Sequence, residues 1–229
     1  MNDVLGQAIY DHYHNPDAGK LWINNKYGPK EEMPIATYFR AEDDMPDIEW
    51  MALEQCRGTV LDIGAGAGSH ALLLQEQGVD VTALDVSPLC INVLKERGVK
   101  KVVEVDVFAY DKNSYDTLLL LMNGIGLVGT ITQLKELLRH LKTLLNKDGQ
   151  ILFDSSDIAY LYEGNLPKQG YYGEIQYQYS YKKLKTEWFN WLYIDEHTML
   201  QIALETGYNM EVLIEDEFGQ YLTRLTLAV

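Results

Sequence analysis

An acidic residue and a row of alternating glycines stand together in the first half of the chain. The segment VLDIGAGAGSH places Asp62 two positions before Gly64, Gly66 and Gly68. Because glycine has no Cβ, a loop of this kind lets a ligand approach the backbone closely. A carboxylate at the mouth of the loop would repel a phosphate, so the pattern favours a ligand that carries positive charge.

Two further acidic residues follow the next two apolar runs. Asp85 ends the segment VTALD, and Asp106 ends VVEVD. An alternative reading makes Asp85 the cap of the helix that begins near Pro88 and makes Asp106 a turn former. Three acids that each follow an apolar strand instead predict carboxylates at the carboxyl ends of a parallel sheet, where such sheets bind nucleotide-like ligands.

Short apolar runs alternate with helical patterns from residue 58 onward, which predicts a βαβ series. The nearly continuous leucines of residues 117–122 indicate a strand that is covered on both faces. Apolar residues recur at helical spacing from Ile131 to Leu145, and NKDG follows as a stop signal. We expect strands at 59–63, 80–84, 102–105, 117–122, 150–153, 210–215 and 221–229, and helices at 47–56, 69–77, 88–96, 131–145 and 196–205.

Two other regions depart from this alternation of strand and helix patterns. Residues 175–181 and 187–194 alternate between apolar and polar side chains, which predicts an inserted antiparallel hairpin. Residues 1–45 show mixed helical and loop character.

The glycine spacing bears on which nucleotide-like cofactor is bound. A dinucleotide fingerprint has the form Gly-x-Gly-x-x-Gly and holds an anionic pyrophosphate. Here Ser69 stands where the third glycine would be, and Asp62 disfavours an anion. S-adenosylmethionine has no phosphate and carries an ammonium and a sulfonium, so it is the expected cofactor. An NAD(P)-dependent oxidoreductase and a non-catalytic S-adenosylmethionine-binding module remain as alternatives.

These motifs resemble those of the class I S-adenosylmethionine-dependent methyltransferases, from about Asp47 to Val229. The resemblance implies an α/β fold with a doubly wound, Rossmann-like, seven-stranded sheet of order 3-2-1-4-5-7-6, in which strand 7 is antiparallel. It implies a methyltransferase domain at 47–229 with a hairpin inserted at about 171–194. It also implies that residues 1–46 form an N-terminal helical lid over the cofactor.

The resemblance implies roles for individual residues. The acid and glycines of the first motif would hold the cofactor, Asp85 would accept the ribose hydroxyls, and Asp106 would lie near the adenine amino group. The segment Asn123-Gly124 would touch the methionine end or the substrate. The expected cofactor-binding residues are Asp62, Gly64, Ala65, Gly66, Gly68, Asp85, Val86, Asp106, Val107, Asn123 and Gly124.

Charge and composition limit the partners. The chain has 19 Lys and Arg against 34 Asp and Glu, a net charge of −15, and such a surface disfavours nucleic acid. The longest apolar run in a predicted strand, 118–122, is far below the roughly 20 residues that span a bilayer. No signal-peptide pattern opens the chain, so we expect a cytoplasmic protein without a membrane partner. It would be a monomer or a homodimer.

Cysteine usage offers no metal site. Cys56 and Cys90 are the two cysteines of the chain. They form no Cys-x-x-Cys pair and have no histidine at ligand spacing, so both are expected to be reduced and buried.

Methyl transfer from a sulfonium depends mainly on positioning, and a base is needed only for a protonated acceptor. Motifs of the DNA-methylating and metal-dependent classes are absent, so a small-molecule acceptor is expected. His12 is the candidate base because histidine titrates near neutral pH; a surface position on a helix is the alternative. His70 is expected at the start of a helix, facing solvent or a neighbouring helix.

Three regions are candidates for the acceptor pocket. The first is the N-terminal segment, which contains Tyr38 and Phe39. The second is the loop after the fifth strand, and the third is the Tyr-rich hairpin. The last two contribute Ser155, Ser156, Asp157, Trp188, Phe189 and Trp191. Capping, turn formation and packing are the alternatives for these residues.

Overall fold

The computed structural model describes residues 3–228. The last residue of the predicted final strand, Val229, lies outside that range. The chain forms two compact units: one contains residues up to Met45 together with 62–110 and 176–189, and the other contains 46–61, 111–175 and 190–229. One sheet has the order β11-β12-β7-β6-β3-β4-β5. Read from β5 in order of appearance along the chain, this is the predicted order 3-2-1-4-5-7-6.

The first unit holds the βαβ series that surrounds the glycine motif. Its elements are α1 (Val4–His14), the end of β3 (Thr59–Ile63), α3 (Ser69–Glu76), β4 (Asp80–Asp85), α4 (Pro88–Glu96) and β5 (Val102–Glu104). β4 and β5 pair in parallel, with Ala83 opposite Val102. From β3 to β5 the bounds agree with the sequence prediction to within about a residue.

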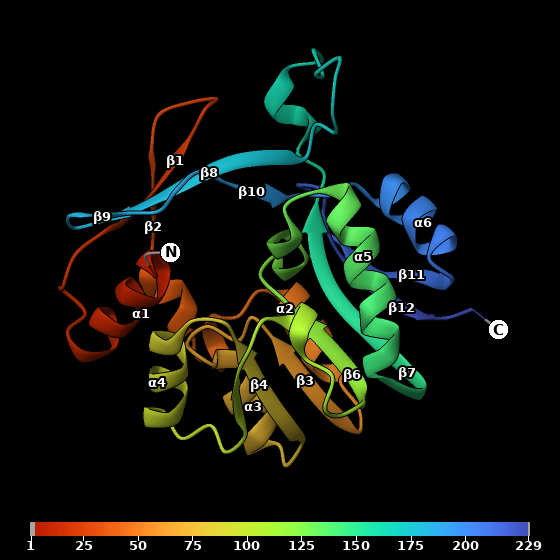
Figure 1. The fold of residues 1–229 in the computed structure, drawn as a ribbon, viewed down its shortest axis with the longest axis horizontal. Coiled ribbons are helices and arrows are strands. Elements are labelled where there is room, and N and C mark those ends of the chain that lie inside the picture. The colour runs from red at the N-terminus through yellow and green to blue at the C-terminus, as the bar shows by residue number, and fades with distance from the viewer. Residues whose placement is uncertain (1–2, 229) are drawn as a thin grey trace. The chain divides into compact units, whose positions relative to one another are not determined.

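Helix α1 packs along α4, as Figure 1 shows at the red end of the ribbon. The two helices meet at their N-terminal caps. Ser87 caps α4 by accepting from Cys90 N, and its hydroxyl donates to the Asp3 carboxylate at 2.5 Å. Asp3 in turn caps α1 by accepting from Gly6 N. A side chain at Gly6 would lie 2.2 Å from Ser87 Oγ, so only glycine allows this contact.

The N-terminal segment also contains strands, which the sequence reading missed. The second sheet has the order β10-β8-β1-β2, and β9 pairs with β8. Its strands are β1 (Leu21–Asn25), β2 (Glu31–Met33), β8 (Glu174–Tyr181), β9 (Leu184–Lys185) and β10 (Phe189–Leu192). The inserted antiparallel strands are therefore present, and their sheet continues into the N-terminal segment. The prediction of a purely helical and loop segment was wrong because β1 is short and its partner is remote in sequence, with Leu21 opposite Tyr181.

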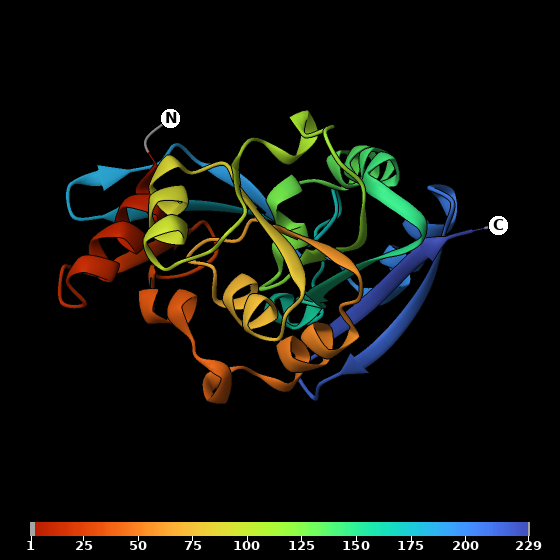
Figure 2. The same cartoon turned by 90° about the horizontal axis from the view of Figure 1, so that it is seen from below.

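The second unit holds the other half of the seven-stranded sheet. Its elements are α2 (Asp47–Gln55), β6 (Tyr115–Leu120), α5 (Ile131–Leu141), β7 (Leu145–Ser156), α6 (Glu196–Glu205), β11 (Tyr208–Glu215) and β12 (Gln220–Leu227). β6 and β7 are parallel. β12 is antiparallel to both β7 and β11, as predicted for the last strand. Figure 2 shows β11 and β12 as the paired blue arrows near the C-terminus.

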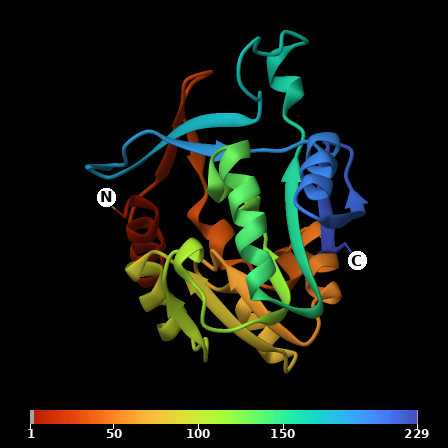
Figure 3. The same ribbon diagram turned by 45° about the vertical axis from the view of Figure 1, so that its right-hand side comes forward.

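The predicted buried runs are the core of this unit. Leu118, Leu119 and Leu120 of β6 have no exposed surface. The apolar stripe of α5 is equally buried, but the helix proper ends at Leu141 rather than Leu145. The NKDG segment lies within the start of β7 and Asp148 there adopts a left-handed conformation. Figure 3 shows β7 running on to the segment 157–171 at its carboxyl end.

Within residues 3–228, no helix is both long and apolar enough to cross a bilayer.

Candidate functional site

The three glycines after β3 adopt left-handed backbone conformations, with φ of 75° at Gly64, 55° at Gly66 and 87° at Gly68. L-residues disfavour this region, which explains the alternating spacing. Gly64 N donates to Leu84 O at 2.8 Å, which ties the loop to the end of β4. A side chain at Gly68 would meet Leu94 at 2.5 Å, whereas one at Gly64 would meet nothing within 4 Å. The open side of the loop is therefore at Gly64.

Asp62 is buried behind this loop, with 2% of its surface exposed. Its carboxylate accepts from Ala71 N and thereby caps α3, whose N-cap residue Gly68 has no side chain. Its second oxygen, Oδ2, is buried and has no hydrogen-bond partner among the described residues. Burial raises the pKa of Asp62 to about 6, although the nearby charge of His70 opposes the shift. An unpartnered buried carboxylate oxygen fits a donor supplied by a cationic ligand.

His70 does not face solvent, contrary to that part of the prediction. It is 7% exposed in the first turn of α3. Its neighbours Ser69 and Ala71 are buried as well, so the whole first turn of α3 is covered.

Asp85 links the end of β4 to the glycine loop. Its Oδ2 accepts from Gly66 N and its Oδ1 from Ser87 N, both at 2.8 Å. The cap of α4 is Ser87, so the alternative role of Asp85 as that cap is wrong. Burial raises the pKa of Asp85, and the two backbone donors oppose the shift. A carboxylate has about four acceptor positions, so two more hydroxyl donors fit here.

Asp106 follows β5 and begins a short 3-10 turn. Its Oδ1 accepts from Phe108 N at 2.9 Å, which is the turn-forming role that the sequence also allowed. The residue is exposed, and the adjacent Val107 is buried. Val86, after β4, is 68% exposed. These exposed positions lie where adjacent parallel strands end, since Val105 N donates to Asp85 O.

Asn123 lies after β6 in the second unit and is hydrogen-bonded on every polar group. Its Oδ1 accepts from Ser155 Oγ at 3.0 Å, and its Nδ2 donates to Leu192 O at 3.2 Å. Its backbone N–H donates to Asp154, and its carbonyl accepts from Gly126 N. The Asn123 side chain therefore links the loop after β6 to β7 and β10. Its predicted contact with the cofactor, like that of Gly124, stays a prediction.

His12 lies on α1 with its ring 5.1 Å from that of Phe39. It lines a cavity of about 330 Å³ together with residues of the chain after α1, among them Lys20 and Glu32. The role of His12 as a base stays a prediction.

Part of the N-terminal segment lies directly on the glycine loop. The Tyr38 ring is 3.5 Å from the position of a Cβ on Gly66. The Ser69 hydroxyl donates to Tyr38 O at 2.9 Å. Arg97 donates to Ala67 O at 2.6 Å, and its guanidinium lies 5.2 Å from the Phe39 ring. These contacts seat the segment over the motif that the sequence singled out.

Comparison with known proteins identifies the family. Residues 39–213 match the family described as "Methyltransferase domain". The chain belongs to this methyltransferase family. A solved S-adenosylmethionine-dependent methyltransferase from Bacteroides fragilis, in complex with S-adenosyl-L-homocysteine, is 41% identical, covers 99% of this chain and 95% of its own, and has a TM-score of 0.92. The protein is thus an S-adenosylmethionine-dependent methyltransferase with the corresponding cofactor.

More distant structures share the fold alone. A methyltransferase from Clostridium acetobutylicum is 12% identical with a TM-score of 0.61, over 82% of this chain and 94% of its own. The PH0226 protein from Pyrococcus horikoshii is 16% identical with a TM-score of 0.62, over 84% and 95%. No curated protein sequence matches the methyltransferase.

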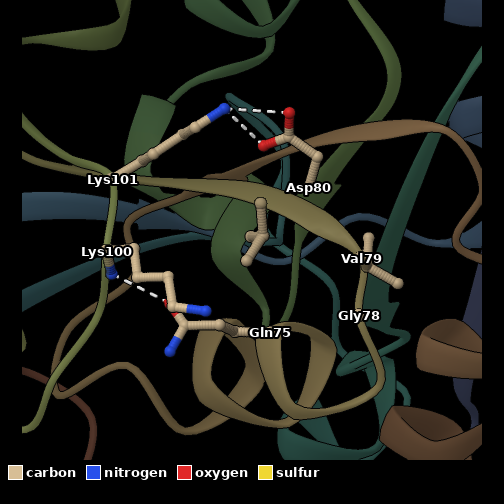
Figure 4. Close-up of a pocket in the computed structure, with 7 residues that line it drawn as sticks. Gln75, Gly78, Val79, Asp80, Lys100 and Lys101 are labelled. Atoms are coloured by element: carbon tan, nitrogen blue, oxygen red, sulfur yellow. Dashed lines mark hydrogen bonds and ion pairs between the residues drawn. The ribbon is translucent and has the colours of Figure 1, made fainter.

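A second cavity of the methyltransferase, of about 270 Å³, lies away from the glycine motif (Figure 4). Asp80 at the start of β4 binds Lys101 there at 2.6 Å, so this cavity is at the opposite end of β4 from Asp85. Across the part of the chain that the structure describes, no group of three or more His, Cys, Asp or Glu could hold a metal ion. Neither cysteine forms a disulfide within residues 3–228; Cys90 is buried and Cys56 only half-buried, so the prediction that both are buried was wrong for Cys56.

The contacts of Ser69, Arg97 and Asp154 were not predicted from the sequence. Ser69 was seen only as a departure from the dinucleotide pattern. Arg97 carries no signal because its partner Ala67 O is a backbone atom. Asp154 carries no signal either, because it is buried and its partner is the backbone N–H of Asn123.

Proposed function

We propose that the carboxylates and glycines after β3, β4 and β5 hold S-adenosylmethionine and that the enzyme transfers its methyl group to a small molecule. The observation that carries this proposal is Asp62 Oδ2, a buried acceptor without a protein donor. The cofactor carries an ammonium that can supply the missing donor. A pyrophosphate would place a second anion beside this carboxylate, which argues against a dinucleotide.

The remaining cofactor contacts follow from position. Gly64, Ala65, Gly66 and Gly68 would present backbone to the ligand, and Asp85 would accept the ribose hydroxyls. Asp106 and the apolar Val86 and Val107 would border the adenine. Asn123 and Gly124 would border the methionine end.

The bound cofactor supplies an activated methyl group whose leaving group needs no acid. The protein's own task is to hold the acceptor in line with that methyl, and such positioning can contribute about 7 to 11 kcal/mol. His12 would accept a proton if the acceptor atom is protonated at neutral pH. Tyr38 would exclude water from the glycine loop on which it lies.

A small acceptor suits the charge of −15, which disfavours nucleic acid. The carboxyl end of β7 offers a polar aromatic surface for it. There Tyr172 donates to Asp157 at 2.7 Å, and Tyr171 donates to Asp195 at 2.5 Å. We further propose a cytoplasmic location and a monomeric or homodimeric state.

Thermal unfolding with S-adenosylhomocysteine and with NAD tests the proposal. A ligand at 100 times its dissociation constant should stabilise the protein by about 2.7 kcal/mol. We expect the shift with S-adenosylhomocysteine and none with NAD. A shift with NAD alone would refute the assignment of the site. Transfer of labelled methyl groups to a metabolite extract, followed by mass analysis, then identifies the acceptor; binding without any transfer would favour a non-catalytic module.

A further inference from the structure

The chain reverses after β6 through two consecutive left-handed residues that are not glycine. Met122 has a φ of 59° and Asn123 a φ of 52°. Residues with a side chain disfavour the left-handed region of φ and ψ. Asparagine can offset this cost with a local side-chain hydrogen bond, but methionine cannot. The conformational cost must be offset by contacts with the surrounding residues. Strained backbone of this kind is frequent at functional sites.

Asp154, near the end of β7, holds the backbone of this turn. Its Oδ2 accepts from Asn123 N at 2.9 Å and from Gln220 Nε2 at 3.0 Å. The next residue, Ser155, holds the Asn123 side chain and accepts from Ile194 N. Successive side chains of a strand point to opposite faces, so Asp154 and Ser155 bind Asn123 from opposite faces of β7.

Stability alone does not account for a carboxylate at this position. Asp154 is 1% exposed, and its Oδ1 is buried with no hydrogen-bond partner among residues 3–228. The charged group that acts on it from α2 is another buried carboxylate, Glu49, rather than a cation. Burial, reinforced by Glu49, raises the pKa of Asp154 to about 6. Its bonds to Asn123 N and Gln220 Nε2 offset only part of the free-energy cost of burying a charge here.

We infer that Asp154 is a positioning residue for the methyl-transfer site, which fixes the Met122–Asn123 turn through the Asn123 amide. The inference rests on the proposed function, which places Asn123 and Gly124 at the methionine end of the cofactor. Asp154 acts through the turn and not by touching the cofactor. Its replacement should therefore separate cofactor affinity from folding stability.

The test compares Asp154→Leu with Asp154→Asn. Leucine has the same branching, is larger and removes the acceptor, whereas asparagine matches aspartate in size and keeps one oxygen for the Asn123 amide. Calorimetry with S-adenosylhomocysteine should show an affinity about tenfold weaker for Asp154→Leu, as for a lost hydrogen bond, and near wild type for Asp154→Asn. The melting temperature of Asp154→Leu should change little, because relief of the buried charge offsets the bonds that Asn123 N and Gln220 Nε2 lose. The matched control is Asp148→Asn, an exposed residue of the same strand, which should change neither quantity.

Wild-type affinity in Asp154→Leu would overturn the inference while leaving the proposed function intact. Failure of the wild-type enzyme to bind S-adenosylhomocysteine would instead sink the proposed function. If Asp154→Leu does not fold, the wild-type protein still decides the question. Binding that depends on the turn must reciprocally stabilise it, so hydrogen exchange of the Asn123 amide should slow when S-adenosylhomocysteine saturates the enzyme. Unchanged exchange at that amide would overturn the inference.

Discussion

Asp62→Asn should make the ligand-free protein more stable and a poorer binder of the cofactor. Burial raises the pKa of Asp62 from its ordinary 3.8 to about 6. The folded state therefore binds this proton more tightly than the unfolded state does. The associated stability is present below pH 4 and is lost as the pH rises through 6.

The magnitude follows from the size of the shift. About two pKa units at 1.36 kcal/mol each give about 3 kcal/mol at pH 7.5, an upper figure for one buried group. Asparagine keeps an acceptor for the Ala71 amide, so the cap of α3 survives. The variant should therefore gain about 3 kcal/mol over wild type at pH 7.5 and almost nothing at pH 4.

Urea unfolding at several pH values measures this difference. Wild type should lose stability between pH 4 and 7.5, and Asp62→Asn should lose less, with the remaining dependence coming in part from Asp154. Calorimetry at pH 7.5 should show S-adenosylhomocysteine affinity reduced about tenfold or more, since its ammonium loses a charged acceptor. Equal stability of the two proteins at pH 7.5 would refute the assignment of a buried, unpaired charge.

Three further substitutions test the rest of the site. Asp85→Ala should weaken S-adenosylhomocysteine binding by about 3 kcal/mol in calorimetry, because two hydroxyls lose a charged acceptor; an unchanged affinity would reject that role. Gly66→Val should abolish binding, because its φ of 55° strains a branched residue and the side chain would occupy the place of the ligand; retained binding would mean that the ligand lies elsewhere. Arg97→Ala should lower the free energy of unfolding by about 1 to 2 kcal/mol in urea and expose residues 15–45 to protease, because it removes the bond to Ala67 O and the contact of the guanidinium with the Phe39 ring; unchanged cleavage would contradict its role in seating that segment.

The fold could be predicted from the sequence where caps and apolar periodicity agree with the contacts that the structure shows. The limits of α4 and α6 match because each has a strong cap, Ser87 and Asp195, before an apolar periodicity. The order of the seven strands came from the resemblance to a family. The acids at the strand ends were recognisable because glycines and apolar runs frame them.

Other parts of the site depend on contacts between residues that are remote in sequence. β1 has too few residues for a clear alternation, and its partner β8 comes much later in the chain. The Asn123 side chain bonds Ser155 Oγ and Leu192 O, and neither partner could be predicted because both are remote in sequence. The burial of His70 depends on packing that no local pattern encodes.

The pairing of β1 with β8 also has a consequence for how the enzyme is made. The Asn24 side chain on β1 donates a hydrogen bond to the Gln178 carbonyl, 154 positions further along the chain. Contacts of such wide separation form slowly because a long loop must close first. During translation β1 cannot pair with β8 until β8 has left the ribosome. Nascent chains halted before that point should therefore lack the β1–β8 part of the second sheet.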